Sequence, residues 1–301
     1  MRITILGSAA GLPTIERGLP AILIEFEGEQ ILFDCGEGTQ RQLLRAKASL
    51  CRKMNIFITH LHGDHLFGLP GLIQTMNLMN RAHPLEVFGP PGLKKFLEET
   101  TISTMPEPVF DLAVNEVKDG EIKKSKSFRV IGAWAEHSVP NMAYKLIVGE
   151  SGGKFNAKKA EDLGILEGPL RGELKAGRVI QLGDGRSVEP SEVLGKPVRG
   201  RGLVYTGDTK PCAGVIGLAE GADLLIHEAT FSCELSERAS GEGHSTAEGA
   251  AMVAKEAKVQ RLLLTHISAR YPDARVLENE AKKVFQNSEA VEDLKVYELK
   301  I

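Results

Sequence analysis

The feature that most constrains this chain is a cluster of four potential metal ligands within six residues, positions 60 to 65. The segment reads His60-Leu61-His62-Gly63-Asp64-His65. It directly follows the apolar run Asn55–Thr59, which predicts a strand, and α/β folds place functional side chains just past the carboxyl ends of strands. Three of the chain's eight histidines lie in this segment. A metal site therefore explains it better than a solvated loop does.

The spacing of these ligands predicts two ions rather than one. Side chains at i and i+2 of a strand share a face, so we expect His60 and His62 to bind the same ion. Asp64 and His65 follow a glycine bend and are free to face a second ion. Imidazole and carboxylate together suit zinc, with manganese or iron as alternatives.

Three more candidate ligands each follow a strand-like run elsewhere in the chain: His137, Asp208 and His266. His227 ends a similar run. We expect one ion to be held by His60, His62 and His137, the other by Asp64, His65 and His266, and both to share Asp208. Two divalent ions with a shared solvent molecule favour hydrolysis, of either a phosphodiester or an acyl bond.

Composition sets limits on partners and location. The chain has 301 residues, 42% hydrophobic residues and a net charge of −3, so nucleic-acid binding requires a local basic patch. Residues 1–6 predict a strand rather than a leader peptide, and no apolar stretch approaches the roughly 18 residues of a membrane span. The four cysteines form no C-x-x-C pair. We therefore expect reduced thiols, a cytoplasmic location and no membrane partner.

The chain alternates strand and helix signals in two halves, which predicts an α/β fold in four αββα layers. Strands are expected at Arg2–Gly7, Ala21–Phe26, Gln30–Asp34, Asn55–Thr59, Phe128–Trp134, Ala143–Val148, Gly202–Thr206, Asp223–His227 and Arg261–Thr265. Helices are expected at Thr39–Ala48, Gly68–Asn80, Thr246–Lys258 and Pro272–Phe285. The second of these helices should pack Leu72, Ile73, Met76 and Met79 on one face.

Residues 149–201 differ from both halves. They are rich in glycine, lysine and arginine, poor in aromatic residues and only weakly periodic. Long insertions of this kind without a clear core are often functional or flexible. The alternative is a surface excursion whose charges are simply solvated.

Together these residues resemble a known family. The H-x-H-x-D-H cluster followed by widely spaced His, Asp and His ligands is similar to the metallo-β-lactamase superfamily. Four further segments resemble tRNase Z (ribonuclease Z), the endonuclease family that removes the 3′ trailer from tRNA precursors: Phe33–Gln40, Tyr205–Thr209, His227–Thr230 and His244–Thr246. The resemblance implies one metallo-β-lactamase sandwich domain spanning residues 1–301, a protruding flexible arm at 149–201 and two Zn²⁺ ions per subunit.

The resemblance also implies catalytic roles. Asp64 would both bind an ion and accept a proton from the attacking water. His244 would act near the leaving oxygen, oriented by Glu228. The alternative for His244 is a structural position before a helix that Ser245 or Thr246 caps. Asp34 would support the metal loop through hydrogen bonds.

The arm would bind tRNA, and the family pattern implies a homodimer. Its candidate contacts with the substrate are Gly168, Pro169, Arg171, Lys175 and Arg178, with Arg17 near the amino terminus. Arg17 lies where bacterial relatives carry Pro-x-Lys-x-Arg-Asn, but Ile15 and Gly18 replace the lysine and asparagine. The handling of the CCA end is therefore left open.

Two alternatives remain at this point. One keeps the fold and changes the substrate, giving a general phosphodiesterase, an arylsulfatase-like enzyme or a lactonase. The other is a catalytically silent RNA-binding protein, which a complete set of ligands disfavours. A di-iron oxygen-reducing protein is disfavoured because such sites usually have a carboxylate at the position of His62.

Overall fold

The computed structural model describes residues 1–101 and 107–301, and contacts within the chain separate it into two compact units. The larger unit comprises Met1–Ser125, Arg129–Leu146 and Gly202–Lys300. The smaller comprises Lys126–Phe128, Ile147–Arg201 and Ile301.

The first sheet of the larger unit is built mainly from the amino-terminal part of the chain. Its strand order is β18-β1-β3-β4-β5-β6-β7, with β1 antiparallel to both of its neighbours and β4 to β7 parallel. The strands are β1 (Arg2–Gly7), β3 (Ala21–Phe26), β4 (Glu29–Phe33), β5 (Met54–Phe57), β6 (Leu85–Gly89), β7 (Leu112–Glu116) and β18 (Val296–Glu298).

The second sheet has the order β17-β15-β14-β13-β10-β9-β8, and β13, β14, β15 and β17 are parallel. These strands are β8 (Gly120–Lys124), β9 (Phe128–Ala135), β10 (Asn141–Val148), β13 (Arg201–Tyr205), β14 (Leu224–Glu228), β15 (Leu262–Thr265) and β17 (Ser288–Ala290). A short parallel pair joins β2 (Ala9–Ala10) to β16 (Ile267–Ser268).

Aromatic side chains fill the space between the two sheets. Phe33 of β4 lies 5.8 Å from Phe57, 5.8 Å from Tyr144 and 5.7 Å from Tyr205, measured between ring centroids. Tyr144 and Tyr205 belong to the second sheet, so these contacts join the two layers. Successive strand residues face opposite sides, and Leu32 and Ile56 accordingly pack on the helix side of the first sheet.

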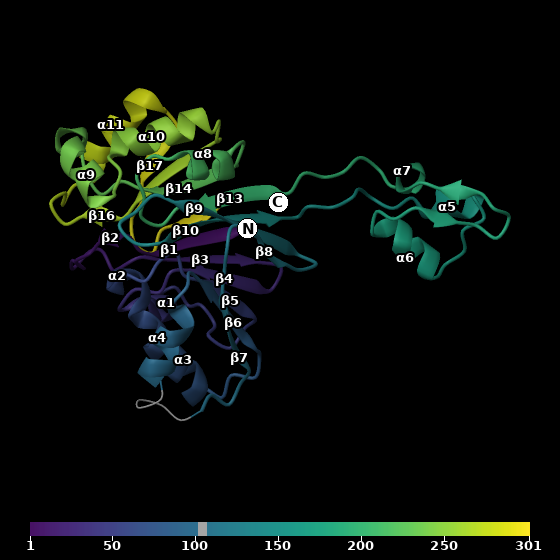
Figure 1. Cartoon of the computed structure of the whole chain (residues 1–301), viewed down its shortest axis with the longest axis horizontal. Helices are drawn as coiled ribbons and strands as arrows, with labels where there is room; N and C mark the ends of the chain where they lie inside the picture. Colours follow the sequence, from purple (N-terminus) through teal and green to yellow (C-terminus); the bar gives the residue numbers. More distant parts are fainter. Residues whose placement is uncertain (102–106) are drawn as a thin grey trace. The chain divides into compact units, whose positions relative to one another are not determined.

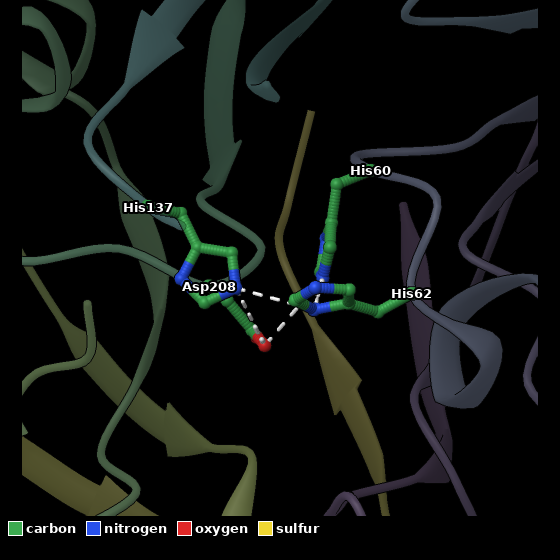
Figure 2. A group of neighbouring side chains, drawn as sticks. All are labelled: His60, His62, His137 and Asp208. Atoms are coloured by element: carbon green, nitrogen blue, oxygen red, sulfur yellow. Dashed lines mark hydrogen bonds and ion pairs between the residues drawn. The ribbon is translucent and has the colours of Figure 1, made fainter. Parts of the chain in front are cut away.

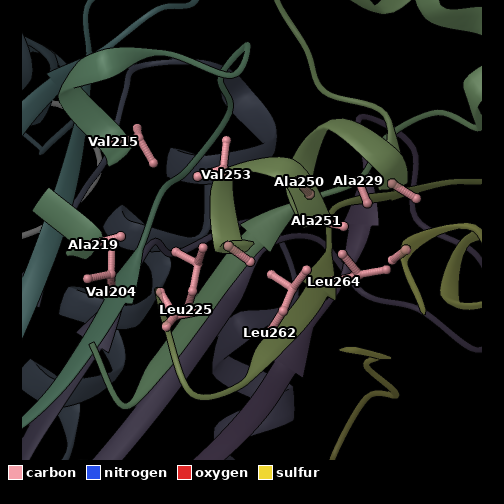
Figure 3. Close-up of a cluster of buried hydrophobic side chains, with 14 of the residues drawn as sticks. Val204, Val215, Ala219, Leu225, Ala229, Ala250, Ala251, Val253, Leu262 and Leu264 are labelled. Carbon is pink, nitrogen blue, oxygen red and sulfur yellow. The ribbon is translucent and has the colours of Figure 1, made fainter. Parts of the chain in front are cut away.

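Helices cover the outer face of each sheet (Figure 1). On the first sheet they pack around a core that includes Leu43, Leu72 and Ile73. On the second sheet, Ala250 and Ala251 meet Leu225 and other strand residues (Figure 3). The helices are α1 (Thr39–Arg45), α2 (Gly63–Leu66), α3 (Gly68–Leu78), α4 (Leu93–Thr101), α8 (Ala213–Ala219), α9 (Ser236–Glu242), α10 (Ala247–Glu256) and α11 (Arg275–Val284), with a 3₁₀ turn η1 (Cys233–Leu235).

The predicted αββα order of layers is confirmed. Strands β6, β7, β8, β17 and β18 and helices α4, α8 and α9 were not expected from the sequence, and two local expectations are wrong. Met79 does not join the buried face of α3: it lies past the end of the helix and is 48% exposed. Strand β5 ends at Phe57, so His60 and His62 lie on a loop and not on one face of a strand. No helix within the described residues is long and apolar enough to cross a membrane.

The smaller unit has more structure than its sequence indicates. Helices α5 (Ala157–Asp162), α6 (Pro169–Lys175) and α7 (Pro190–Val193) accompany a hairpin of β11 (Ile180–Gln181) and β12 (Ser187–Val188). Six side chains form a buried core of its own: Ala160, Ile165, Leu174, Ile180, Val188 and Val193. The expectation that this segment lacks a core is therefore wrong. Weak periodicity hid it because each element is only one or two turns long.

The start of α3 packs directly against the loop after β4. The amide of Gly68 donates to the carbonyl of Cys35 over 2.9 Å. A β-carbon on Gly68 would lie 2.0 Å from the carbonyl oxygen of Gly36, a distance that only backbone movement can relieve. Only glycine therefore lets these two loops meet.

We expect Gly68→Ala to lower the free energy of unfolding by about 1–3 kcal/mol, because overpacking forces the backbone apart. Urea denaturation measures the change. The matched control is Gly71→Ala in the same helix, where the nearest atom, Gln40 Oε1, is 3.6 Å from the new β-carbon. Alanine there should be neutral or stabilise by about 0.5–1 kcal/mol. Equal stability of the two variants would contradict this account.

Candidate metal centre

The candidate ligands converge from loops that leave the carboxyl ends of strands in both sheets. The loop after β5 and helix α2 carry the cluster at residues 60 to 65. His137 lies between β9 and β10, Asp208 follows β13, and His266 follows β15. All seven predicted ligands are brought together in two groups. A third possible group, Asp208, His244 and His266, shares residues with both.

The first group consists of His60, His62, His137 and Asp208. Figure 2 shows their side chains pointing toward one another. His62 Nδ1 lies 3.1 Å from His60 Nε2 and 3.3 Å from His137 Nε2, and Asp208 Oδ2 lies 3.6 Å from His60 Nε2. Ligands about 2.0–2.1 Å from a tetrahedral ion are spaced at roughly these distances.

The second group consists of Asp64, His65 and His266. His266 Nε2 lies 3.4 Å from Asp64 Oδ2, and His65 Nε2 lies 3.6 Å from the same oxygen. Asp208 approaches this group as well: its Oδ1 is 3.3 Å from His65 Nε2 and its Oδ2 is 3.3 Å from His266 Nε2. The position predicted for a shared ligand is thus occupied by a carboxylate that contacts both groups.

Hydrogen bonds on Nδ1 orient four of the five histidines. His137 Nδ1 donates to the carbonyl of Gly243 over 2.8 Å, and His65 Nδ1 donates to Asp34 over 2.7 Å. Threonine hydroxyls accept from the other two, at 3.0 Å for His60 and 2.8 Å for His266. These bonds leave Nε2 of each of the four rings facing the cluster, as the atom available to a metal.

The chemistry of the donor set fits divalent cations. His65 Nε2 and Asp208 Oδ1 are buried and have no hydrogen-bond partner among the described residues, which is costly unless an ion satisfies them. Burial lowers the pKa of both His60 and His62, so their rings are neutral and able to coordinate. Cation binding to such ligands is coupled to proton release.

The charge of the buried carboxylates also attracts a cation. Burial opposes charge on His65, yet the negative charges of Asp208 and Asp34 outweigh it and raise the pKa of His65 well above its ordinary value. A proton there offsets part of this negative charge, and a divalent cation would displace that proton. The described residues thus form a site able to hold divalent metal.

Asp34 connects the cluster to the framework of the fold. It is fully buried and adopts a left-handed backbone conformation, with φ of 55°. Its Oδ1 accepts from the amide of Thr59 over 2.7 Å, and its Oδ2 accepts from the hydroxyl of Tyr205 over 2.8 Å. The same carboxylate also accepts from His65 Nδ1, so Asp34 links the ligand cluster to both sheets.

His244 and Glu228 form a pair beside the cluster. Glu228 Oε1 accepts from His244 Nδ1 over 2.8 Å, and the backbone amides of Thr209 and Ser245 donate to the same carboxylate. Burial disfavours the charged imidazolium, but the hydrogen bond and charge of Glu228 outweigh it and raise the pKa of His244 to about 9. His244 Nδ1 is also 4.0 Å from Asp208.

The predicted substrate contacts differ in their surroundings. Lys175 and Arg178 are exposed, although Arg178 pairs with Glu173. Gly168 and Pro169 begin α6 at the surface. Arg171 is 7% exposed, and its guanidinium donates to the carbonyl of Ile165 and to Glu161. This side chain stabilises the smaller unit, and we do not keep it as a contact with RNA.

Arg17 is also engaged within the protein. Its Nη1 donates to Ser8 Oγ over 2.6 Å and to the carbonyl of Val291 over 2.8 Å. The guanidinium nevertheless lines a charged cavity of about 440 Å³. His227 is fully buried, with Nδ1 2.8 Å from the carbonyl of Glu228, and it does not join either ligand group.

Three hydroxyl residues of the site were not predicted from the sequence. Thr59 bonds both Asp34 and His60, Tyr205 bonds Asp34, and Thr230 bonds both Glu228 and His266. Thr230 and Tyr205 lie inside the segments that resemble ribonuclease Z, which was the available signal. Their roles depend on contacts between distant loops and cannot be read from spacing.

The fold and this cluster of histidine and aspartate ligands place the chain in the metallo-β-lactamase superfamily. Its residues 171–267 match the family model described as "Beta-lactamase superfamily domain", and residues 1–110 match the model "Anti-Pycsar protein Apyc1". The chain is 47% identical to a ribonuclease Z of Archaeoglobus fulgidus, with 97% of this chain and 95% of that protein covered. It is 43% identical to a ribonuclease Z of Methanosarcina acetivorans, with 99% and 98% covered.

A solved structure agrees with these relatives. The structure of human tRNase Z, short form, superposes with a TM-score of 0.74 at 30% identity and covers 100% of both chains. The chain therefore belongs to the ribonuclease Z family.

We expect Asp34→Asn to weaken divalent metal binding about 10- to 100-fold, because the amide no longer holds His65 by a charged hydrogen bond. Competition with a chromogenic chelator measures the affinity. Tyr205→Phe is the matched control: it removes one donor to the same carboxylate and leaves the bond to His65 intact. Equal affinities of wild type and Asp34→Asn would show that the carboxylate does not support the site.

Proposed function

We propose that this chain is an endoribonuclease that removes the 3′ trailer of tRNA precursors and leaves a 3′-hydroxyl on the tRNA. The observation that carries the proposal is the two-group ligand cluster with the His244–Glu228 pair beside it, in a chain whose ribonuclease Z relatives match it over nearly their full length.

The ligand set supports two zinc ions per subunit, with manganese or iron as alternatives. When bound, such ions supply a nucleophilic solvent at neutral pH and stabilise charge on the phosphoryl group. Elemental analysis of protein purified without added metal identifies the ion.

We also propose that the protein forms a homodimer, and sedimentation measurements test this oligomeric state. The proposed location is the cytoplasm.

Asp64 is the proposed acceptor of the proton of the attacking water. Burial would raise its pKa, but the hydrogen bond with His266 and the charges of His65 and His266 hold it well below the usual range. Asp64 is therefore ionised at neutral pH. The amide of Gly11 donates to its Oδ2 over 3.0 Å, which fixes the carboxylate. A weak base of this kind orients the water and takes up the proton as the transition state forms.

His244 is the proposed acid on the leaving-group side. Its pKa of about 9 keeps the ring protonated at neutral pH, so it can donate a proton to the departing oxygen. Glu228 holds the other nitrogen and is itself fixed by backbone amides. The pair thus supplies a proton from a defined direction without using a metal ligand.

The smaller unit is the proposed binding element for tRNA. Its exposed cations include Lys154, Lys158, Lys159, Lys175 and Arg178. These side chains suit contacts with phosphates, which position a nucleic acid without reading its sequence. Gly168, at φ of 157°, and Pro169 present the start of α6 at the surface of the same unit. The buried core of this unit holds these groups on a folded surface.

Deletion of the smaller unit tests whether this unit binds tRNA precursors as the substrate. The backbones of Ser151 and Val198 are hydrogen-bonded to each other in both directions, at 3.2 and 2.9 Å, so a Gly-Gly turn can replace residues 152–197. We expect kcat/KM for a tRNA precursor to fall at least about tenfold, or ~1.4 kcal/mol. Hydrolysis of bis-p-nitrophenyl phosphate should continue, because that diester offers no tRNA surface to bind.

Asp64→Ala serves as the control for this experiment and should abolish both activities. If the deletion leaves tRNA-precursor cleavage unchanged, the smaller unit does not bind the substrate. If wild type hydrolyses only the small diester, a general phosphodiesterase replaces the proposed function.

We expect Glu228→Gln to move the alkaline limb of the pH–rate profile to lower pH. The cause is the pKa of His244, which should fall from about 9 toward its ordinary value of 6.5 when the carboxylate charge is lost. Since the acid must be protonated, the variant should lose activity at a pH where wild type is still active. Rates of precursor cleavage between about pH 6 and 10 measure the limb.

The same pair has a consequence for stability. The folded-state pKa of His244 exceeds the unfolded value, so its contribution is complete below about pH 6.5 and is lost as the pH rises through about 9. Glu242→Gln is the control for the pH–rate experiment on Glu228→Gln, since the charge of Glu242 raises the pKa of His244 least among the named causes. A limb that moves equally in both variants would rule out the specific role of Glu228.

A further inference from the structure

A pocket of about 710 Å³ opens beside the candidate metal centre, and His137 lines it. Volumes of about 300–1,000 Å³ are typical of sites that bind small organic groups. The lining is largely apolar, with Trp134, Val139 and Pro91 among its members, and Lys210 and Glu136 add one charge of each sign. Because His137 belongs to the ligand cluster, an occupant of this pocket lies next to that cluster.

Trp134 is the only tryptophan in the chain, and it lies near the end of β9. Alternation along this strand places it on the same side as Val130 and Gly132, which are buried. Trp134 is instead 38% exposed, since the strand runs beyond the core at this point. A large aromatic side chain that faces an open pocket is suited to a ligand.

The backbone around Trp134 is fixed before any ligand arrives. The amide of Lys210 donates to the carbonyl of Glu136 over 2.8 Å, in an isolated bridge between the two loops. Gly214 of α8 packs against the carbonyl of Trp134, so closely that a β-carbon there would lie 2.4 Å from that oxygen. Because the backbone is already held, only the side-chain rotamer of Trp134 has to be ordered on binding.

We propose that Trp134 is the stacking platform for one nucleobase of the RNA strand next to the scissile phosphate. The inference rests on the function proposed above and adds to it a subsite outside the metal cluster and the arm. Unpaired bases stack on aromatic rings irrespective of sequence, at about 1–3 kcal/mol per base. The ammonium of Lys210 suits an adjacent phosphate, and the apolar walls exclude water from the base.

Kinetics of precursor cleavage test the platform first. We expect Trp134→Ala to lower kcat/KM about 5- to 150-fold, the range equivalent to one stacked base. Trp134→Phe keeps a flat ring and should retain most of the activity. Met252→Ala is the control for loss of an exposed apolar side chain, since Met252 is 49% exposed on α10 and does not line the pocket.

Abasic substitution of the precursor identifies the base. Single abasic nucleotides are placed at each position flanking the cleaved bond and assayed with wild type and Trp134→Ala. At one position the missing base should slow wild type and leave Trp134→Ala unaffected, because both changes remove the same contact. Additive effects at every position would overturn the proposal, as would wild-type rates for Trp134→Ala.

Fluorescence gives an independent readout of contact. In an Asp64→Asn variant that does not cleave RNA, Trp134 is the sole tryptophan, so its emission reports on this pocket alone. Binding of the precursor should quench it, and the precursor with the critical base removed should not. Unchanged emission on saturation with the intact precursor overturns the platform. If wild type fails to cleave the precursor at all, the proposed function fails and the subsite fails with it.

Discussion

The interaction on which the rest of this structure depends is the buried carboxylate of Asp34. It accepts hydrogen bonds from Thr59, from Tyr205 of the second sheet and from His65 of the ligand cluster. One group therefore joins two sheets and one metal-binding loop. A buried carboxylate without donors would be costly, so the three donors together stabilise its burial. The cluster is correspondingly held by the fold and not by flexible loops.

The same principle extends outward from Asp34. Thr59 and Thr230 each connect a carboxylate to a histidine through one hydroxyl. The hydroxyl of Thr59 donates to Asp34 and accepts from His60, and the hydroxyl of Thr230 donates to Glu228 and accepts from His266. Such relays set the tautomer of every supported histidine and leave Nε2 for a cation. The charge left in the cluster is negative, which explains its attraction for protons and divalent ions alike. In the His244–Glu228 pair a carboxylate also orients a histidine, but there it favours binding of a proton by the imidazole and not of a metal ion.

Much of the site could be predicted because its chemistry is local in the sequence. Four ligands lie within six residues, and the others each end an apolar run, so strand periodicity alone indicated a common edge. His60 and His62 do not share a strand face as expected, since β5 ends before them. Their rings still meet, because the loop after the strand turns both toward His137. The arm's core was missed since its elements are too short to show a period.

The sequence by itself determined the ligand types, the strands that precede them and the family that these residues resemble. Those properties depend on residue identity and on spacing along the chain. Tertiary structure decided which positively charged side chains are exposed to solvent and which form hydrogen bonds inside the protein. Arg171 is buried and its guanidinium donates to a backbone carbonyl of the smaller unit, whereas Trp134 is exposed in the pocket that His137 also lines. Both outcomes depend on packing between distant segments, which periodicity does not encode.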